Sequence, residues 1–431
     1  GKPGWLVGRG LASKGAGAKT ASSGDEMGAG EVSGIVGGDG GGPGASRAVN
    51  MADVVDMLAD SNPAKHRPGD RGKVYQLDKA ELKELFPAGI AGAWHLLLFG
   101  SRSRMPQHLR RADDWWNLCL KDTPGMVIRQ EASHIMSALS CVARTNTLKG
   151  EPRVDTPGFL IDGAPGTGKS AVLNHVAHWA MKTGEWIVVW VPHASDLVTG
   201  KGMYAREHLD EETKRGEIIV QPSYALKLLT ELVKMNRDKL SQLTVEDEGA
   251  QVPITDAVAA LEELLLLPRE AKAMPMLEKV IAALKEQTKF PVLVAVDEIN
   301  ALHGMSLYRD LDMKLLHAHN IKMAKLLGAY LDAGYKRGVV VGAATRQGLY
   351  AHVKLPPFNA KPIQLRGFTI EEIETYTTYM YKVKDLFTPP SKELFEYLAF
   401  CTAGRPLDIE KACAHELFNL GQRTFPKFVQ K

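Results

Sequence analysis

The sequence predicts an α/β fold, with a doubly wound parallel sheet at its centre and helical additions before, within and after it. Three observations lead to this prediction. From Asp155 onward, short β-branched apolar runs alternate with helical patterns, as expected for parallel strands joined by crossover helices. A glycine-rich loop separates the first of these runs from the helical pattern that follows. The segments before the first run and after the last one have helical periodicity.

The composition allows one large core or two modest ones. The chain has 431 residues, of which 45% are hydrophobic, and its formal net charge is +3. A net charge this small gives no uniform attraction to nucleic acid, so a contact with a polyanion would need a local patch. The four cysteines are scattered without C-x-x-C pairs, which disfavours disulfides and structural zinc. The longest apolar runs are too short to span a membrane.

Residues 1–50 form a glycine-rich segment that we expect to be flexible. They contain 16 of the 41 glycines and little periodicity, so they lack the apolar surface needed for a core. No acidic residue precedes Asp25, whereas four basic residues do. This bias resembles that of an organelle transit segment, although such segments are usually richer in Arg and Ser. A plain flexible arm explains the same composition.

Residues 51–150 are predicted to be a largely helical region. The stretches DKAELKELFPAGI and VIRQEASHIMSALSCVA place apolar residues three and four positions apart. Between them, residues 101–130 contain six Lys/Arg against three Asp, with Trp115 and Trp116 among them. Such a stretch either contacts RNA phosphates and bases or forms a solvated helix face over buried tryptophans.

Residues 151–366 contain five candidate strands, enough for a doubly wound domain. The candidate strands are residues 158–162, 185–192, 290–298, 338–345 and 361–365. The interval 193–289 is too long for a single crossover connection, so we expect a helical insertion there. From residue 367 to 431 the pattern is helical, which predicts a C-terminal helical lid followed by a basic tail.

The loop after the first candidate strand has the pattern of a phosphate-binding loop. Residues 163–170 read GAPGTGKS and satisfy the Walker A, or P-loop, motif G-x-x-x-x-G-K-[ST] between a strand and a helix. Its glycines let backbone N–H groups surround phosphates, Lys169 can reach the terminal phosphates, and the Ser170 hydroxyl can bind Mg²⁺. The helix that follows adds the partial positive charge of its N-terminus. The predicted nucleotide-binding residues are Gly163, Ala164, Pro165, Gly166, Thr167, Gly168, Lys169, Ser170 and Ala171.

The second half of the predicted site is the acidic pair Asp297 and Glu298. The pair follows the apolar run PVLVAV, so Asp297 would lie at the tip of a neighbouring strand and hold Mg²⁺ together with Ser170. In many P-loop ATPases with an extra strand between the two motifs, the second acid orients the attacking water as a general base. Glu298 is therefore the candidate catalytic residue. A carboxylate that only makes a polar contact or caps a helix fits the pattern equally well.

Two further positions are candidates for sensing the terminal phosphate, Thr345 and Arg405. Thr345, with Arg346 behind it, ends the candidate strand 338–345, and Thr345 is counted among the nucleotide-binding residues. Arg405 precedes a helix of the predicted lid. The plainer interpretations are a turn residue at a strand end and a surface arginine near the start of a helix.

Motifs for guanine recognition and for metal binding by histidines are missing from the sequence. The tetrapeptide N-K-x-D, which reads guanine, is absent, so the motifs do not identify the base. The histidine pairs His175/His178 and His317/His319 have no constellation of carboxylates or thiols beside them. They are interpreted as ordinary core or surface histidines. The predicted class is therefore a P-loop NTPase fold with an AAA- or STAND-like organisation, whose base and turnover stay open.

Several stretches together resemble one known family. They are GKVYQLDKAELKELFPAGI, MVIRQEASHIMSAL, LIDGAPGTGKSAVLNHVAHWA and LVAVDEINALHG, within roughly residues 70–420. The chain resembles the death-associated protein 3 family, known also as mitochondrial small ribosomal subunit protein 29. The element G-K-x-Y…L-F-P-x-G is the useful discriminator, because ordinary AAA-type ATPases have no reason to contain it.

The resemblance implies a structural protein in the head of the mitochondrial small ribosomal subunit, on the side that forms intersubunit bridges. The implied partners are small-subunit ribosomal proteins, small-subunit rRNA and, through the bridges, the large subunit. It also implies a mitochondrial location, and some members have a reported pro-apoptotic role.

The resemblance further implies a bound guanine nucleotide, GTP or GDP, with Mg²⁺ and with weak or absent hydrolysis. The matching residues are Gly166, Gly168, Lys169 and Ser170 for phosphates and Mg²⁺, and Asp297 for the metal. Glu298 departs from the animal members, which have Gly there, and so keeps ATP open as the nucleotide. The alternative function is a freestanding ATPase switch of the signalling or AAA-like class that uses Asp297 and Glu298.

Overall fold

The structure is a computed structural model that describes most of the chain from Leu58 to Phe418. The described residues are 58–76, 125–145, 158–200, 204–210, 215–328, 335–346, 348–355, 360–382, 386 and 389–418. The glycine-rich segment 1–50, residues 101–124 of the basic stretch and the tail 419–431 lie outside these ranges. The expectations for those segments, and the domain boundaries, stay predictions. None of the described helices has the length and apolar character that a membrane span needs.

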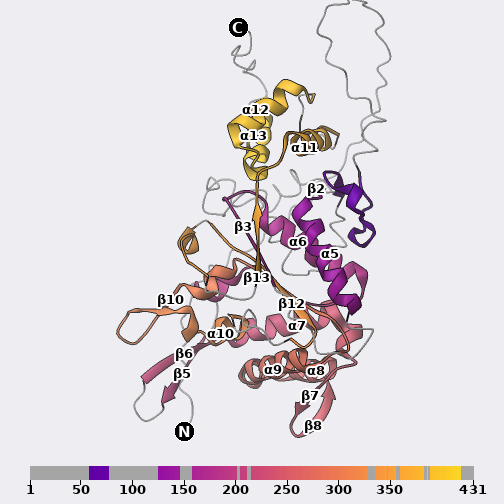
Figure 1. The fold of residues 1–431 in the computed structure, drawn as a ribbon. Helices are drawn as coiled ribbons and strands as arrows, with labels where there is room; N and C mark the ends of the chain where they lie inside the picture. Colours follow the sequence, from indigo (N-terminus) through magenta and orange to yellow (C-terminus); the bar gives the residue numbers. More distant parts are fainter. Residues whose placement is uncertain are drawn as a thin grey trace, which may run out of the picture. The chain divides into compact units, whose positions relative to one another are not determined.

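A five-stranded parallel sheet forms the centre of the fold (Figure 1). Its strands are β3 (Gly158–Gly163), β4 (Ile187–Val191), β9 (Val292–Asp297), β12 (Gly338–Ala343) and β13 (Ala360–Leu365). They follow the spatial order β13-β3-β12-β9-β4, and every pairing is parallel. The five strands predicted from the sequence are therefore confirmed. β12 lies between β3 and β9, the strands that lead into the glycine-rich loop and the acidic pair.

Helices cover both faces of this sheet, which confirms the doubly wound class. Successive residues of a strand point to opposite faces, so Val189 and Val191 belong to one core and Val188 and Trp190 to the other. The first core contains α7 (Pro222–Leu240), α8 (Ile254–Glu263), α9 (Leu266–Glu286) and α10 (Lys322–Gly328); the second contains α5 (Gln130–Thr145) and α6 (Lys169–Thr183). Burial on both faces explains why β4 reads IVVWV without alternation.

The insertion between β4 and β9 contains strands as well as the expected helices. Besides η4 (Ala194–Leu197) and helices α7 to α9, it has two antiparallel hairpins: β5 (Ala205–Asp210) with β6 (Arg215–Val220), and β7 (Thr244–Asp247) with β8 (Ala250–Pro253). The sequence analysis does not predict these hairpins. Their strands are short and mostly polar, so the alternation that marks a half-buried strand is weak.

A third hairpin and two small helices follow the acidic pair. Directly after β9, the chain forms η5 (Ile299–His303), then β10 (Met305–Arg309) paired with β11 (Leu315–His317), and η6 (Ala318–Asn320). After β12, η7 (Gly348–Tyr350) leads toward β13.

The described segments on either side of the sheet domain pack against each other. After η1 (Pro63–Lys65) and η2 (Pro68–Asp70), β1 (Val74–Gln76) pairs with β2 (Gly125–Val127), a strand pair that the sequence analysis does not predict. After β13, the chain forms α11 (Ile370–Lys382), α12 (Lys392–Thr402) and α13 (Pro406–Phe418). Residues of these helices share a core with Val74 and Val127.

Candidate nucleotide-binding site

The loop between β3 and α6 has a backbone shape that only glycine adopts easily. Gly166 and Gly168 have φ angles of 80° and 91°, in the left-handed region that L side chains disfavour. A Cβ at Gly163 would lie 2.5 Å from the backbone oxygen of Leu365 on the adjacent strand β13. Gly168 is the N-cap of α6, so the loop turns directly into the first turn of this helix. This is the strand–loop–helix geometry that the motif requires.

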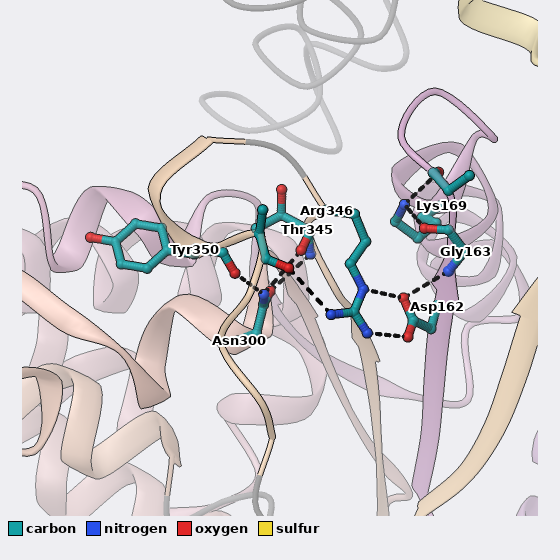
Figure 2. Close-up of polar contacts among 9 residues, drawn as sticks. Asp162, Gly163, Lys169, Asn300, Thr345, Arg346 and Tyr350 are labelled. Atoms are coloured by element: carbon teal, nitrogen blue, oxygen red, sulfur yellow. Dashed lines mark hydrogen bonds and ion pairs between the residues drawn. The ribbon is translucent and has the colours of Figure 1, made fainter.

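Lys169 points back into this loop from the first turn of α6 (Figure 2). Its ammonium Nζ donates hydrogen bonds to the carbonyl oxygens of Gly163, at 2.7 Å, and Ala164, at 2.9 Å. The residue is 8% exposed, and burial lowers the pKa of the ammonium to about 8 although Asp162 and Asp297 oppose this shift. Two uncharged carbonyls are weak partners for a buried cation. An anion such as a phosphate would be a stronger one.

Ser170 and Asp297, the two predicted metal residues, lie within hydrogen-bond reach of each other. Asp297 ends β9, is buried, and accepts a hydrogen bond from the Ser170 side chain. Burial, together with the nearby Glu298 carboxylate, raises the pKa of Asp297 to about 7, and the hydroxyl of Ser170 opposes this rise. A hydroxyl and a carboxylate beside a lysine are the groups that hold Mg²⁺ in P-loop proteins. The donor set therefore fits the expected metal.

Glu298 follows β9 directly, but its carboxylate is held by the neighbouring strand connection. Its backbone has a φ of 56°, and its N–H donates to Asp297 Oδ1 at 2.9 Å. The Ser195 hydroxyl of η4, which follows β4, donates a hydrogen bond to the Glu298 carboxylate. A left-handed backbone at a non-glycine residue costs about 1 kcal/mol. Contacts on both sides hold Glu298 in this conformation.

Arg346 forms a bidentate ion pair with Asp162, the residue before the glycine-rich loop (Figure 2). Arg346 Nε donates to Asp162 Oδ1 at 2.8 Å, and a second guanidinium nitrogen donates to Oδ2. Asp162 Oδ1 also accepts the Gly163 N–H at 2.7 Å. The guanidinium hydrogen bonds hold the pKa of Asp162 below its ordinary value. Arg346 also lowers the pKa of Lys169 by repulsion, so two cations face the start of the loop.

Thr345 is positioned through its backbone by Asn300, a residue that the sequence analysis does not single out (Figure 2). The Thr345 N–H donates to Asn300 Oδ1 at 2.8 Å. Asn300 Nδ2 donates to the carbonyl oxygens of Thr345, at 3.0 Å, and Tyr350, at 2.7 Å. Asn300 is buried in η5, so its amide joins the segment after β9 to the segment after β12. The sequence signal that could have identified Asn300 is its position as an amide residue within the otherwise apolar stretch after the acidic pair.

The C-terminal helices contact the glycine-rich loop through Leu407 and not through Arg405. The Arg405 guanidinium pairs with Asp408 at 2.9 Å and donates to the Thr402 carbonyl. The Leu407 N–H donates to the Gly166 carbonyl at 3.3 Å, and its Cβ lies 3.2 Å from the position that a Cβ on Gly166 would take. Gly166 thus allows the first turn of α13 to approach the loop closely. Arg405 therefore has the contacts expected of a surface arginine near the start of a helix, which is the plainer of its two interpretations.

The histidines of α6 belong to a buried cluster with the segment before β1. His175 Nε2 lies 3.2 Å from His66 Nδ1, and the His175 and Tyr75 ring centroids are 4.7 Å apart. Burial lowers the pKa of His178 to about 4 and that of His175 well below its ordinary value. Among the residues that the structure describes, no group of three or more His, Cys, Asp or Glu could hold a metal ion. The core interpretation of these histidines agrees with this arrangement.

Fold and loop together define the class of protein. The strand order places β12 between the strand that enters the glycine-rich loop and the strand that ends in Asp297. A parallel sheet of this order, with a G-x-x-x-x-G-K-[ST] loop opening a helix, is the P-loop NTPase fold of the AAA/STAND-like type.

Comparison with known proteins identifies the family. The sequence model of the family described as mitochondrial ribosomal death-associated protein 3 matches residues 126–387. The chain belongs to this family, as the sequence resemblance predicted.

Relatives from animals and fungi carry the same printed name, small ribosomal subunit protein mS29. The mouse (Mus musculus) protein is 24% identical over 386 residues, which cover 84% of this chain and 90% of the relative. The cattle (Bos taurus) protein is 24% identical over 309 residues, 68% of each chain. The protein of Schizosaccharomyces pombe is 28% identical over 198 residues, 44% of this chain and 40% of the relative.

Among solved structures, a STAND protein with a tetratricopeptide repeat sensor from Pyrococcus horikoshii is similar to this chain. The identity is 14%, the TM-score is 0.27, and the match covers 63% of this chain and 28% of the other. A similarity this low carries no argument, so the fold class rests on the strand order and the loop described above.

Proposed function

We propose that this chain is a structural protein of the mitochondrial small ribosomal subunit and that it holds a purine nucleotide with Mg²⁺ between β3 and α6. Family membership and the names of the mouse, cattle and yeast relatives support the ribosomal role and a location in mitochondria. The partners are then small-subunit ribosomal proteins, small-subunit rRNA and, through intersubunit bridges, the large subunit.

The observation that carries the nucleotide part is the buried ammonium of Lys169. It lies where the terminal phosphates of a nucleotide would lie against the motif, and it donates only to two backbone carbonyls of its own loop in the contacts described above. Backbone N–H groups of residues 166–171 would surround the phosphates. Ser170 and Asp297 would hold Mg²⁺, which would offset the negative charge of the phosphates and of the Asp297 carboxylate.

GTP or GDP is the proposed nucleotide, with ATP as the alternative. This preference rests on the family resemblance, because the residues described above would contact the phosphates and the metal and not the base. Arg346 adds a second cation beside Lys169, and the Asp162 carboxylate accepts hydrogen bonds from its guanidinium. We infer that Thr345 contributes through the placement of its backbone, which Asn300 holds.

Sedimentation of a native mitochondrial extract tests both parts of the proposal. We expect the chain in the small-subunit and monosome fractions, with about one nucleotide per chain, which mass spectrometry of the extracted nucleotide would identify. A chain that stays at the top of the gradient at every salt concentration contradicts the ribosomal role. A chain that sediments with the subunit but carries no nucleotide contradicts the nucleotide part alone.

A second candidate function is that of a freestanding ATPase switch, and the position of Glu298 favours it. The Glu298 carboxylate follows Asp297 directly and is held by Ser195 instead of projecting freely into solvent. If Glu298 acts as a general base, Glu298→Gln should slow hydrolysis by the purified chain about a hundredfold. Equal, negligible hydrolysis by the wild type and the variant would contradict this candidate.

A further inference from the structure

The hairpin formed by β10 and β11 exposes large apolar side chains on its outer face and at its tip. The exposed fractions are 46% for Met305, 48% for Leu307, 67% for Leu311, 66% for Met313 and 41% for Leu315. We call these five residues the hairpin patch. They lie within eleven consecutive residues, whereas single exposed apolar residues are normal on a protein surface. A concentration of this kind marks an interaction site.

The hairpin patch is presented by a backbone that contacts the rest of the domain. The Leu307 N–H donates to the Val198 carbonyl at 2.7 Å, and the Leu311 N–H donates to Glu217 Oε1 at 3.0 Å. Arg206 of the neighbouring β5–β6 hairpin donates to the Arg309 carbonyl at 3.0 Å, which joins the two hairpins (Figure 1). A partner would therefore bind a pre-ordered surface, at little cost in conformational entropy.

The two faces of the hairpin differ in burial, so the exposure of the patch is not a sign of loose packing. On the inner face, Ser306, Tyr308 and Leu316 are buried, and the Ser306 hydroxyl donates to the Leu316 carbonyl at 2.7 Å. The inner face thus contributes to the core of the domain. The outer face is the part of the hairpin that the described residues leave uncovered.

The charges around the patch argue against RNA as its partner. In the hairpin, residues 305–317, Arg309 and Lys314 balance Asp310 and Asp312. Arg309 donates to the Met313 carbonyl at 2.6 Å, and Lys314 pairs with Asp312 at 3.6 Å. An RNA-binding surface needs cations available to neutralise phosphates, and this surface offers a balanced set that is already engaged.

The neighbouring β5–β6 hairpin, residues 205–220, carries three Lys/Arg against five Asp/Glu, so it adds net negative charge beside the patch. Arg206 pairs with Glu217 at 2.9 Å, and Lys322, which follows η6, lies 3.4 Å from Glu278 and 3.9 Å from Glu207. Arg206 and Lys322 are therefore each paired with carboxylates. A neutral centre of Leu and Met inside a polar rim is the composition of a protein–protein interface, and Met adapts its shape to a partner.

We propose that the hairpin patch is the docking site for another protein, which presents an apolar groove that receives the Leu and Met side chains. Leu311 and Met313 at the tip would enter the groove, and Met305, Leu307 and Leu315 would cover its edge. In the ribosomal setting this partner is a protein of the ribosome and not rRNA. The choice of a ribosomal partner rests on the proposed function, whereas docking through the patch rests on the geometry and charge of the hairpin alone.

Site-specific photocrosslinking in the full-length chain tests this proposal. The photoreactive residue benzoylphenylalanine is placed at position 313, the chain is expressed in its native cells, and irradiated extracts are separated on a sucrose gradient. We expect one crosslinked protein in the fractions that contain the chain, with the crosslinked peptide rich in aliphatic or aromatic residues. The matched control carries the probe at position 265, because Leu265 is 81% exposed and lies outside the patch; it should not crosslink to that protein.

A second variant tests whether the apolar character of the patch is responsible. Leu311→Asp in the chain with the probe at position 313 should lower the yield of this crosslink about tenfold, because it places a charge in an apolar groove. Leu265→Asp should leave the yield unchanged. Both positions are exposed, so neither substitution should lower the melting temperature of the purified chain.

The remaining outcomes overturn the proposal. They are a crosslink from position 313 to RNA, a crosslink to a second copy of this chain, the absence of any specific crosslink, and a crosslink whose yield Leu311→Asp leaves unchanged. If the proposed ribosomal role is wrong, the chain is found outside the ribosomal fractions. A specific crosslink to one non-ribosomal protein that Leu311→Asp weakens would then still support docking through the patch.

Discussion

Hydrogen bonds hold both the glycine-rich loop between β3 and α6 and the β10–β11 hairpin in place. The two regions differ in how far apart in the sequence the hydrogen-bond partners lie. In the loop, the partners of Lys169 lie five and six residues away, at Ala164 and Gly163. In the hairpin, Leu311 bonds to Glu217, 94 residues away, and Arg309 bonds to Arg206, 103 residues away. The contacts of Lys169 are therefore specified locally, whereas the contacts that join the hairpin to the rest of the domain depend on the finished fold.

The two regions also reverse the usual distribution of side chains. The loop buries an ammonium group, and the hairpin exposes five large apolar side chains. Each arrangement is costly in isolation, since burial disfavours the charged group and water disfavours the apolar ones. Under the two proposals above, an anion would bind to the loop and an apolar protein surface to the hairpin.

The largest expected effect tests the locally specified region. With GTP at a thousand times its Kd, the wild type should gain about 4 kcal/mol of stability through ligand binding. Lys169→Ala removes the contact with the terminal phosphates, so this gain should largely disappear in thermal melts with and without nucleotide. Lys227→Ala, on an exposed residue of α7, is the matched control and should keep the full gain. Equal protection of wild type and Lys169→Ala would show that the proposed cradle is wrong.

The next effect tests the long-range contacts around the site. Asn300→Ala removes three hydrogen bonds, with the N–H and carbonyl of Thr345 and the carbonyl of Tyr350, so it should lower the free energy of unfolding by about 3 kcal/mol. Asn320→Ala removes one half-buried hydrogen bond, to the Glu217 carbonyl, and should cost about 1 kcal/mol. Urea unfolding measures both values. Equal costs for the two variants would mean that Asn300 does not hold the segment after β12.

Acid should weaken the packing of α6 against the N-terminal segment. Burial depresses the pKa of His178 to about 4 in the folded chain, so the folded state resists protonation that the unfolded state accepts near pH 6.5. Above pH 6.5, His178 therefore leaves the free energy of unfolding unchanged. As the pH falls toward 4, His178 lowers this free energy, by about 2 kcal/mol at pH 5.

Urea unfolding between pH 7.5 and pH 5 measures the effect of His178. His178→Leu should flatten the decline of stability over this interval, because the titrating group is removed. His352→Gln, at an exposed histidine, should leave the decline as it is in the wild type. A decline of the same slope in all three proteins would show that His178 is not the group responsible.

A smaller effect concerns the ion pair at the start of the loop. Asp162→Asn removes the carboxylate that Arg346 contacts with two nitrogens, and the free energy of unfolding should fall by about 1–2 kcal/mol. Arg346→Lys should recover little of the pair's contribution, because lysine cannot make the bidentate contact. A double-mutant cycle isolates the coupling, and a coupling near zero would mean that the pair does not stabilise the loop.

The smallest expected effect is on the stability of the hairpin itself. Leu311→Asp and Met313→Asp replace side chains that are about two-thirds exposed, so each should change the free energy of unfolding by less than about 0.5 kcal/mol. Tyr308→Ala, on the buried face of the same hairpin, should cost about 3 kcal/mol or more. A loss at Leu311 comparable to that at Tyr308 would show that the patch serves folding and not docking.

Local sequence predicted the five sheet strands, the glycine-rich loop and Asp297, because each depends on residues close together in the chain. β4 needs only its apolar run, and the loop needs only glycines before Lys169 and Ser170. α6 ends at Gly184 for a similar reason, because the left-handed backbone there, with a φ of 71°, suits glycine. The family resemblance was visible in stretches of this kind as well.

The contacts around these elements could not be predicted in the same way. The sequence does not show that Ser195 holds Glu298, that Arg346 pairs with Asp162, or that Leu407 reaches Gly166. These partners are between 103 and 241 positions apart in the chain. The parallel sheet brings the segments after its strands together, and the packing of α13 brings Leu407 to the loop.

The sequence by itself determined the fold class, the glycine-rich loop between β3 and α6 and the family, since periodicity, glycine positions and motif spacing are local properties. Only the tertiary structure decided which carboxylate each polar side chain meets, and which face of the β10–β11 hairpin is left exposed. The physical reason is that a hydrogen bond or a buried face depends on distance in space. Folding sets that distance through the packing of many residues at once.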